Sequence, residues 1–261
     1  MCRWMAYQGD AVYLESLLFK QEHSLIHQSL SARKSEVTVN ADGFGLGWYD
    51  EQEEPGLYHE VLPAWSDSNL RSLAKHIKSG LFFAHVRSST GTETNRSNCH
   101  PFSYKNWLFM HNGQIGGYES LRWQLDRLIP EHLYSHRHGA TDSEVIFLLM
   151  IANGLESDPE NAISVTLAQI IDIMKQKKIS DPFRFTAVFS DGEEIIAVRF
   201  SSDEQAPSLY CKEFEHHIVI GSEPLDLSSE SWTQVPAGHI ARIKQHKYQI
   251  TPLPEALKMT A

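Results

Sequence analysis

The chain begins Met1-Cys2-Arg3-Trp4-Met5-Ala6-Tyr7-Gln8, and this stretch decides both the expected fold and the expected chemistry. Residues 2–8 are largely apolar and are typical of a short strand. Removal of Met1 would place a thiol and a free α-amine on one residue, Cys2. Because an α-amine has a pKa of about 7.7–8.0, it can take the proton of the thiol and return it later. Cys2 is therefore a candidate N-terminal nucleophile, and the alternative is a chance cysteine at the start of a strand.

The composition restricts the classes of protein to which the 261 residues can belong. Hydrophobic residues make up 41% and charged residues 21%, as in ordinary globular chains. The net charge of −10 argues against nucleic acid as a partner. The longest apolar run, residues 145–152, is too short to cross a bilayer, and no secretory signal is visible. Three widely spaced cysteines favour free thiols over disulfides, so we expect a cytoplasmic protein with no membrane partner.

The order of the expected elements predicts an α+β fold in one domain, residues 1–261, because no linker divides the chain. Alternating glycines at Gly43, Gly45 and Gly47 indicate a strand whose backbone is closely approached on one face. Residues 21–34 are polar and predict a loop. Helices are expected over residues 11–20, 70–80 (capped by Asp67 or Asn69), 119–129, 142–153 and 159–178. Strands are expected over residues 2–8, 43–48, 81–86, 107–110, 185–189, 195–200, 208–211, 217–221, 238–243 and 248–250.

Three positions carry the polar groups that attack on an amide carbonyl requires. Asn112-Gly113 follows an apolar strand, where a side-chain amide and an unhindered backbone N–H can form an oxyanion hole. Arg87 ends another apolar strand, and its guanidinium can hold a carboxylate through two hydrogen bonds. Asp142 begins a helix and can accept from an ammonium. Each has a plain structural alternative: a turn, a surface charge and a helix N-cap.

The order of five motifs identifies the family that this sequence resembles. The motifs are Met1-Cys2-Arg3, Ala84-His85-Val86-Arg87-Ser88-Ser89-Thr90, Asn98-Cys99-His100-Pro101-Phe102, Met110-His111-Asn112-Gly113-Gln114-Ile115 and Thr141-Asp142-Ser143-Glu144. Together they resemble the class II glutamine amidotransferases, which are N-terminal-nucleophile (Ntn) glutaminases, and specifically their stand-alone, YafJ-type branch. Three further stretches extend the resemblance over most of the chain. They are residues 40–49, Pro63-Ala64-Trp65-Ser66-Asp67 and Ser222-Glu223-Pro224-Leu225.

The resemblance implies a four-layer αββα sandwich of two antiparallel sheets and assigns roles to six residues. Cys2 matches the nucleophile, with its α-amine as base. Asn112 and Gly113 match the side-chain and backbone donors to the oxyanion. The substrate's glutamyl end would be held by the remaining three, with Arg87 and Thr90 at its α-carboxylate and Asp142 at its α-ammonium. The implied reaction cleaves a γ-glutamyl amide through a thioester, with no metal or organic cofactor.

Three departures from the synthase-linked members leave the substrate and partners open. Ser88 and Gly91 stand where the sugar-phosphate synthase has an aromatic residue and a histidine, so the cover over the glutamyl site is expected to differ. The third departure is that no attached synthase domain is expected. It is expected to be a hydrolase of glutamine or a related γ-glutamyl compound, a glutaminase subunit that needs an acceptor-domain partner, or a non-catalytic glutamyl sensor.

The remaining histidines favour structural roles. His132, His136 and His138 lack the convergent spacing of a zinc site and are expected in loops or on the surface. His100 is expected to support the active-site loop from beneath, together with Phe102. His85 and His111 are expected as core partners of the site, because the α-amine already fills the role of base.

Overall fold

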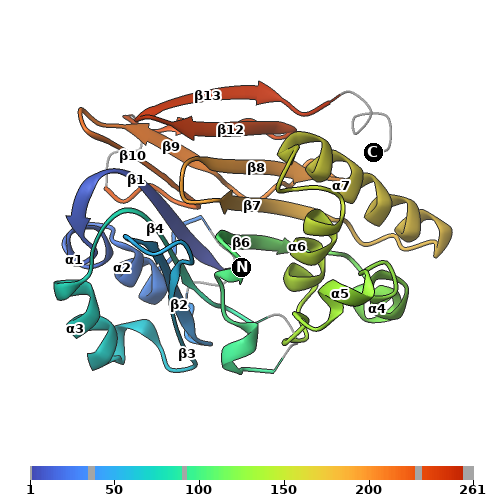
Figure 1. Ribbon diagram of the computed structural model, residues 1–261, viewed down its shortest axis with the longest axis horizontal. Helices are drawn as coiled ribbons and strands as arrows, with labels where there is room; N and C mark the ends of the chain where they lie inside the picture. The colour runs from blue at the N-terminus through green and yellow to red at the C-terminus, as the bar shows by residue number, and fades with distance from the viewer. Residues whose placement is uncertain (1, 35–38, 90–92, 227–230, 255–261) are drawn as a thin grey trace.

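The computed structural model describes residues 2–34, 39–89, 93–226 and 231–254, which form two antiparallel β-sheets flanked by helices (Figure 1). The first sheet has the strand order β11-β9-β10-β1-β4-β2-β3, and the second has the order β13-β12-β8-β7-β6-β5. The first sheet contains β1 (Arg3–Tyr13), β2 (Phe44–Tyr49), β3 (Gly56–Glu60), β4 (Lys78–Val86), β9 (Tyr210–Glu213), β10 (His217–Gly221) and β11 (Thr233–Gln234). The second contains β5 (Phe102–Tyr104), β6 (Trp107–Gln114), β7 (Arg184–Ser190), β8 (Ile195–Ser201), β12 (His239–Lys244) and β13 (Lys247–Pro252).

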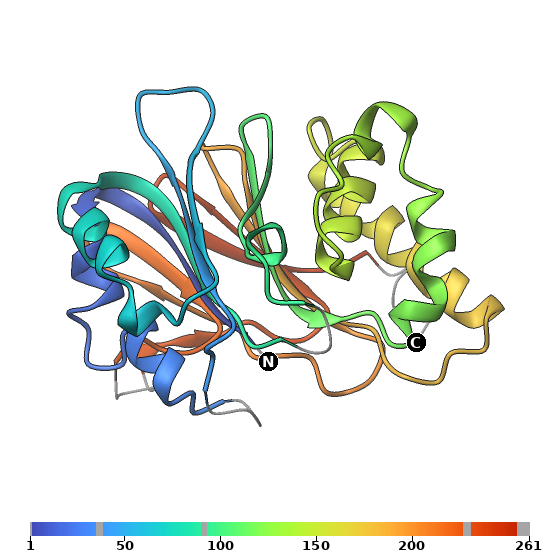
Figure 2. The same ribbon diagram turned by 90° about the horizontal axis from the view of Figure 1, so that it is seen from below.

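The helices cover the outer faces of the two sheets (Figure 2). On the first sheet lie α1 (Glu15–Leu18), α2 (Leu25–Leu30), the 3₁₀ turn η1 (Ala64–Ser66) and α3 (Ser68–His76). On the second lie α4 (Tyr118–Asp126), α5 (Glu131–Tyr134), α6 (Asp142–Ala152) and α7 (Pro159–Gln176), while the 3₁₀ turn η2 (Arg96–Asn98) precedes β5. The arrangement confirms the expected four-layer αββα sandwich.

Side-chain alternation along the central strands builds the three buried layers of this sandwich. In β1, Met5 and Tyr7 face the helices, whereas Trp4 and Ala6 face the second sheet. Strand β6 alternates in the same way, with Met110 in the layer between the sheets. Because both faces of a central strand are buried, its sequence is a nearly continuous apolar run instead of an alternating one. This burial explains the continuous apolar runs at residues 81–84 of β4 and 107–110 of β6.

The strand of alternating glycines is confirmed as β2, and its close approach is visible at Gly45. A Cβ atom on Gly45 would lie 2.1 Å from the carbonyl oxygen of His100. Such a distance is far inside van der Waals contact, so only glycine lets β2 pack against this segment. Gly47 is similarly confined by the side chains of Leu108 and Pro101.

Two local expectations are wrong in the first quarter of the chain. Residues 11–13 continue β1 instead of starting a helix, because Val12 and Tyr13 pair with Ser79 and Lys78 of β4. Within residues 11–20, the helix is limited to α1, residues 15–18. The expected loop over residues 21–34 contains α2, whose N-cap Ser24 accepts a hydrogen bond from the His27 N–H at 3.3 Å. Tertiary pairing and burial override local periodicity in both places.

Other boundaries follow recognisable local signals. The Asp67 carboxylate caps α3, which ends at His76 and not at residue 80, because residues 78–80 belong to β4. The Thr141 hydroxyl caps α6 by accepting from the Glu144 N–H. Strands β7 and β8, both expected from the sequence, pair as an antiparallel hairpin with Asp191-Gly192 between them. No helix among the described residues has the length and apolarity that a membrane span requires.

Candidate active site

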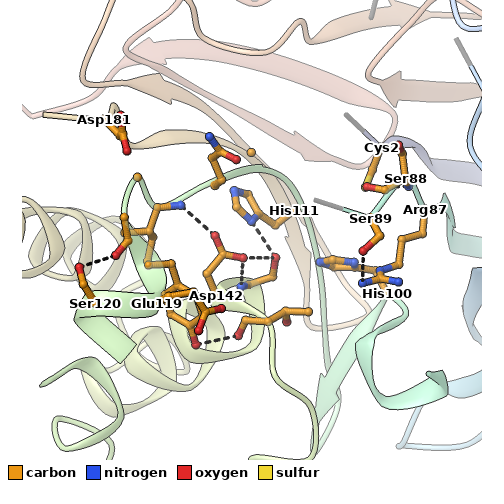
Figure 3. Close-up of a pocket in the computed structure, with 18 residues that line it drawn as sticks. Cys2, Arg87, Ser88, Ser89, His100, His111, Glu119, Ser120, Asp142 and Asp181 are labelled. Carbon is orange, nitrogen blue, oxygen red and sulfur yellow. Dashed lines mark hydrogen bonds between the residues drawn. The ribbon is translucent and has the colours of Figure 1, made fainter. Parts of the chain in front are cut away.

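A cavity of about 420 Å³ lies where the start of β1 meets the ends of β4 and β6. Its wall continues through the segment before α4 and the first residues of α6 (Figure 3). Segments that are distant in sequence therefore converge on one space. Of the six residues expected at the site, Cys2, Arg87, Gly113 and Asp142 line this cavity. Thr90 lies outside the described residues.

Cys2 is the partly exposed member of three free cysteines. Its Sγ lies 3.4 Å from the backbone N–H of Ser88 and 3.5 Å from the Ser88 carbonyl oxygen. Cys99 and Cys211 are buried, and desolvation raises the pKa of these thiols to about 11 and about 12. Since a thiolate is the reactive form of cysteine, both buried thiols are poorly suited as nucleophiles.

Arg87 directly follows β4 and is almost entirely buried beside Cys2. Its guanidinium donates to the Asp42 carbonyl oxygen and the Ser89 hydroxyl, each at 3.3 Å. It also donates to the Glu93 carbonyl oxygen at 3.4 Å. These partners fix the orientation of the fork of N–H groups, which is the geometry that suits a carboxylate.

Asn112 and Gly113 lie within β6, which extends to Gln114 instead of ending at residue 110 as expected. Strand alternation from Met110 directs Asn112 toward the layer between the sheets. Asn112 is 1% exposed, and within the described part of the chain its side-chain amide has no hydrogen-bond partner. It is not among the residues that line the cavity, whereas Gly113 is. The side-chain amide thus lies behind the wall in this conformation.

Gly113 occupies a position that a side chain cannot share. Its φ is +154°, and a Cβ atom there would lie 1.9 Å from the Arg184 carbonyl oxygen. The absence of a side chain lets β6 pass against β7 and leaves the backbone open to the cavity.

Asp142 joins the end of β6 to the start of α6. Its Oδ2 accepts from the Ile115 N–H and its Oδ1 from the Ser143 N–H, both at 2.8 Å. The Ser143 hydroxyl also donates to Oδ1 at 3.4 Å. A carboxylate offers about four acceptor sites, so these three hydrogen bonds leave capacity for one donor of a ligand in the cavity. The N-cap of α6 is Thr141, so the N-cap alternative is wrong for Asp142, which is the first residue of the helix and lines the cavity.

Three buried histidines surround these groups, and the Asp142 carboxylate favours the charged form of His111 without outweighing the effect of burial. Nδ1 of His111 lies 2.9 Å from the Ser143 hydroxyl, and Nε2 lies 3.3 Å from the Arg184 carbonyl. His85 stacks on His100 with ring centroids 4.3 Å apart. Burial and the nearby charge of Arg87 lower the pKa of His85 to about 3. Burial likewise lowers the pKa values of His100 and His111, so all three rings are neutral at pH 7.

A buried ion-pair network next to Cys2 was not predicted from the sequence. Arg3 is fully buried, and its Nε lies 3.1 Å from Oε1 of Glu223. Oε2 of Glu223 contacts Nε2 of His23 at 2.9 Å, and the backbone N–H groups of residues 33 and 34 also donate to this carboxylate. Burial raises the pKa of Glu223, but these hydrogen bonds outweigh burial and hold the pKa below its usual value. The one sequence signal was a charged residue within the apolar start of β1.

No group of three or more histidine, cysteine, aspartate or glutamate side chains comes together at a metal-binding distance within the described ranges. His136 contacts Tyr104 edge to face instead, with ring centroids 5.0 Å apart.

Comparison with known proteins places the chain in a class and a family. A glutamine aminotransferase class-II domain protein from Silicibacter pomeroyi matches with a TM-score of 0.78 at 37% identity, over 97% of this chain and 99% of that one. The glutamine phosphoribosylpyrophosphate amidotransferase of Bacillus subtilis, at 16% identity, shares the fold with a TM-score of 0.68 over 97% of this chain and 49% of that one. The sandwich is the Ntn-hydrolase fold. Residues 16–209 match the family model of class-II glutamine amidotransferases, so the chain belongs to that family.

Two curated relatives span nearly the whole chain. The probable glutamine amidotransferase DUG3 of Saccharomyces cerevisiae is 29% identical over 97% of this chain and 84% of its own length. The gamma-glutamyl-hercynylcysteine sulfoxide hydrolase of Mycolicibacterium smegmatis is 26% identical over 97% of this chain and all of its own. One relative is thus named for amide transfer and the other for γ-glutamyl hydrolysis.

Proposed function

We propose that this protein is an amidohydrolase that cleaves the γ-glutamyl amide bond of glutamine or a related compound through a thioester on Cys2. The observation that carries the proposal is the convergence of Cys2, Arg87, Gly113 and Asp142 on one cavity. A thiol, a buried cation, an unhindered backbone and a carboxylate acceptor are the groups that a zwitterionic glutamyl substrate requires. The relative named as a γ-glutamyl hydrolase supports the same bond type.

The first half of the reaction begins once Met1 has been removed and the α-amine of Cys2 is free. The amine takes the proton of the thiol, and Sγ attacks the carbonyl carbon of the γ-amide. The carbonyl oxygen becomes an oxyanion, for which the Gly113 N–H and the Asn112 amide are the proposed donors. When the intermediate collapses, the C–N bond breaks, and the α-ammonium returns its proton to the departing amine.

The second half of the reaction repeats these steps with water as the nucleophile. The amine takes a proton from water, the hydroxide adds to the thioester, and the C–S bond breaks. The proton then returns to the sulfur, so that the thiol and glutamate are the products. Atoms and charges balance without a further reactant.

The proposed glutamyl site uses opposite charges at its two ends. Arg87 binds the α-carboxylate with help from Thr90, and Asp142 binds the α-ammonium. Asn112 must turn or shift toward the cavity to act as donor, because it is enclosed in this conformation. The Asn112 amide has no hydrogen-bond partner among the described residues, and the bound substrate would supply one. We propose that all 261 residues serve this one domain.

The test is a turnover assay with a panel of γ-glutamyl amides and peptides, with glutamate as the measured product. The Cys2→Ala variant is expected to abolish turnover and keep the fold, whereas the matched Cys211→Ala variant keeps turnover. Release of glutamate by Cys2→Ala would contradict the proposal. Activity that requires a second protein from the native extract would favour the glutaminase-subunit alternative, and binding without turnover would favour the sensor.

A further inference from the structure

A buried histidine with unused hydrogen-bonding groups lies in the wall of the active-site cavity. His100 is 4% exposed and lines the cavity together with Cys2 and Arg87. In the part of the chain that the structure describes, neither Nδ1 nor Nε2 of His100 has a hydrogen-bond partner. Buried polar groups in native proteins nearly always have a partner, since an unsatisfied one costs free energy. Because His100 belongs to the cavity wall, a molecule bound in the cavity can supply this partner.

The His100 ring is held in one orientation by its neighbours. It stacks on His85 on one side, and the edge of Phe102 contacts it with ring centroids 4.6 Å apart. Its backbone is fixed by the close approach of β2 at Gly45. A hydrogen-bonding group that is already oriented loses little conformational entropy when a ligand binds. These contacts agree with the supporting role expected from the sequence, but they do not use the two ring nitrogens.

The electrostatic surroundings set which hydrogen bonds the ring can make. Burial first, and then the neighbouring rings and the Arg87 charge, lower the pKa of His100 well below its usual value. The ring is therefore neutral and offers one N–H donor and one acceptor nitrogen. The Arg87 charge acts on this ring, and Figure 3 shows both groups on the same side of the pocket. A carboxylate held by Arg87 has spare acceptor sites that a neighbouring N–H can use.

We propose that His100 is a further substrate-binding residue, which donates a ring N–H to the α-carboxylate of a γ-glutamyl substrate held by Arg87. The inference rests on the proposed function, because it assumes that Arg87 binds this carboxylate. His100 adds a neutral N–H donor beside the charged guanidinium of Arg87. Together the two residues select a planar carboxylate over an uncharged group. The stacked pair of His85 and His100 then serves to position that donor.

The experiment compares His100→Phe, which keeps a stacking ring without nitrogens, with His100→Gln and His100→Asn, which restore a donor near Nε2 or Nδ1. Calorimetry in the Cys2→Ala background measures the Kd without consuming the ligand. Three ligands are used: glutamine, glutarate monoamide, which lacks the ammonium, and 4-aminobutanamide, which lacks the carboxylate. Circular dichroism and a thermal melt confirm that each variant is folded.

For His100→Phe, the Kd for glutamine and for glutarate monoamide is expected to rise about 10- to 150-fold, as for a lost hydrogen bond to a charged group. The Kd for 4-aminobutanamide is expected to stay unchanged, and either His100→Gln or His100→Asn restores part of the loss. An equal loss for all three ligands, or no loss for any, would overturn the inference. Wild-type protein that binds glutamine without turning it over would overturn the proposed catalysis and leave the role of His100 to stand on the binding data.

Discussion

Replacing Asp142 by asparagine tests whether this carboxylate both stabilises the fold and binds the substrate. Both carboxylate oxygens accept a backbone N–H, one from Ile115 and one from Ser143, at 2.8 Å each. Asparagine has one oxygen and one NH₂ group, so in either orientation one of these N–H groups faces a donor. An unsatisfied N–H of this kind costs about 1–3 kcal/mol. Loss of the negative charge at the start of α6 costs about 0.3–1 kcal/mol more.

The free energy of unfolding of Asp142→Asn is therefore expected to fall by about 1–4 kcal/mol in total. The assay is denaturant unfolding followed by far-UV circular dichroism, with Asp158→Asn as the matched control. Asp158 caps α7 through a single hydrogen bond to the Asn161 N–H, and asparagine is an equally good N-cap. The control is expected to stay within about 0.5 kcal/mol of wild type.

The same substitution separates the structural role of Asp142 from the proposed binding role. If Asp142 accepts from the α-ammonium, Asp142→Asn also raises the KM for glutamine by about 10- to 100-fold, as for loss of a charged hydrogen bond. The KM for glutarate monoamide, which has no ammonium, changes much less. A variant with wild-type stability would refute the hydrogen-bond reasoning. A folded variant with an unchanged KM for glutamine would refute the binding role.

Three further changes test other parts of the account. Glu223→Gln leaves the buried Arg3 without its counter-ion and is expected to cost about 3–5 kcal/mol in denaturant unfolding, so a loss below 1 kcal/mol would contradict the ion pair. Gly113→Ala is expected to destabilise far more than Gly238→Ala, which shares a positive φ but has nothing within 4 Å of its Cβ position; equal midpoints would speak against the contact with β7. Because the folded pKa of His85 is about 3, the unfolded state binds more protons below pH 6.5, and stability is lost as the pH falls from 6.5 toward 3. Between pH 7.5 and 5.5, His85 alone is expected to lower the free energy of unfolding by about 1 kcal/mol. If the His85→Phe variant lost stability with pH as steeply as wild type, that result would argue against a neutral buried ring.

Elements with strong local signals were predictable from the sequence. The starts of α6 at Asp142 and of α7 at Pro159 are local features, and each occurs where the sequence predicts it. The buried strands β4 and β6 were visible because both of their faces are covered, which makes their sequences continuously apolar. The order of motifs, and not periodicity, indicated the four-layer sandwich.

Features that depend on distant partners were not predictable. Residues 11–13 have helical spacing, but pairing with β4 keeps them in a strand. Arg3 and Glu223 are 220 positions apart, so no local pattern announces that one neutralises the other. The enclosed side chain of Asn112 and the unpartnered nitrogens of His100 also follow only from tertiary packing.

The most direct test of the central claim is the intact mass of active protein, quenched with acid during turnover of glutamine and followed by peptide mapping. The account predicts a chain without Met1 and a transient increase by one γ-glutamyl group, located on the N-terminal peptide at Cys2. Active protein that retains Met1 throughout, or a glutamyl group on any other residue, would contradict it.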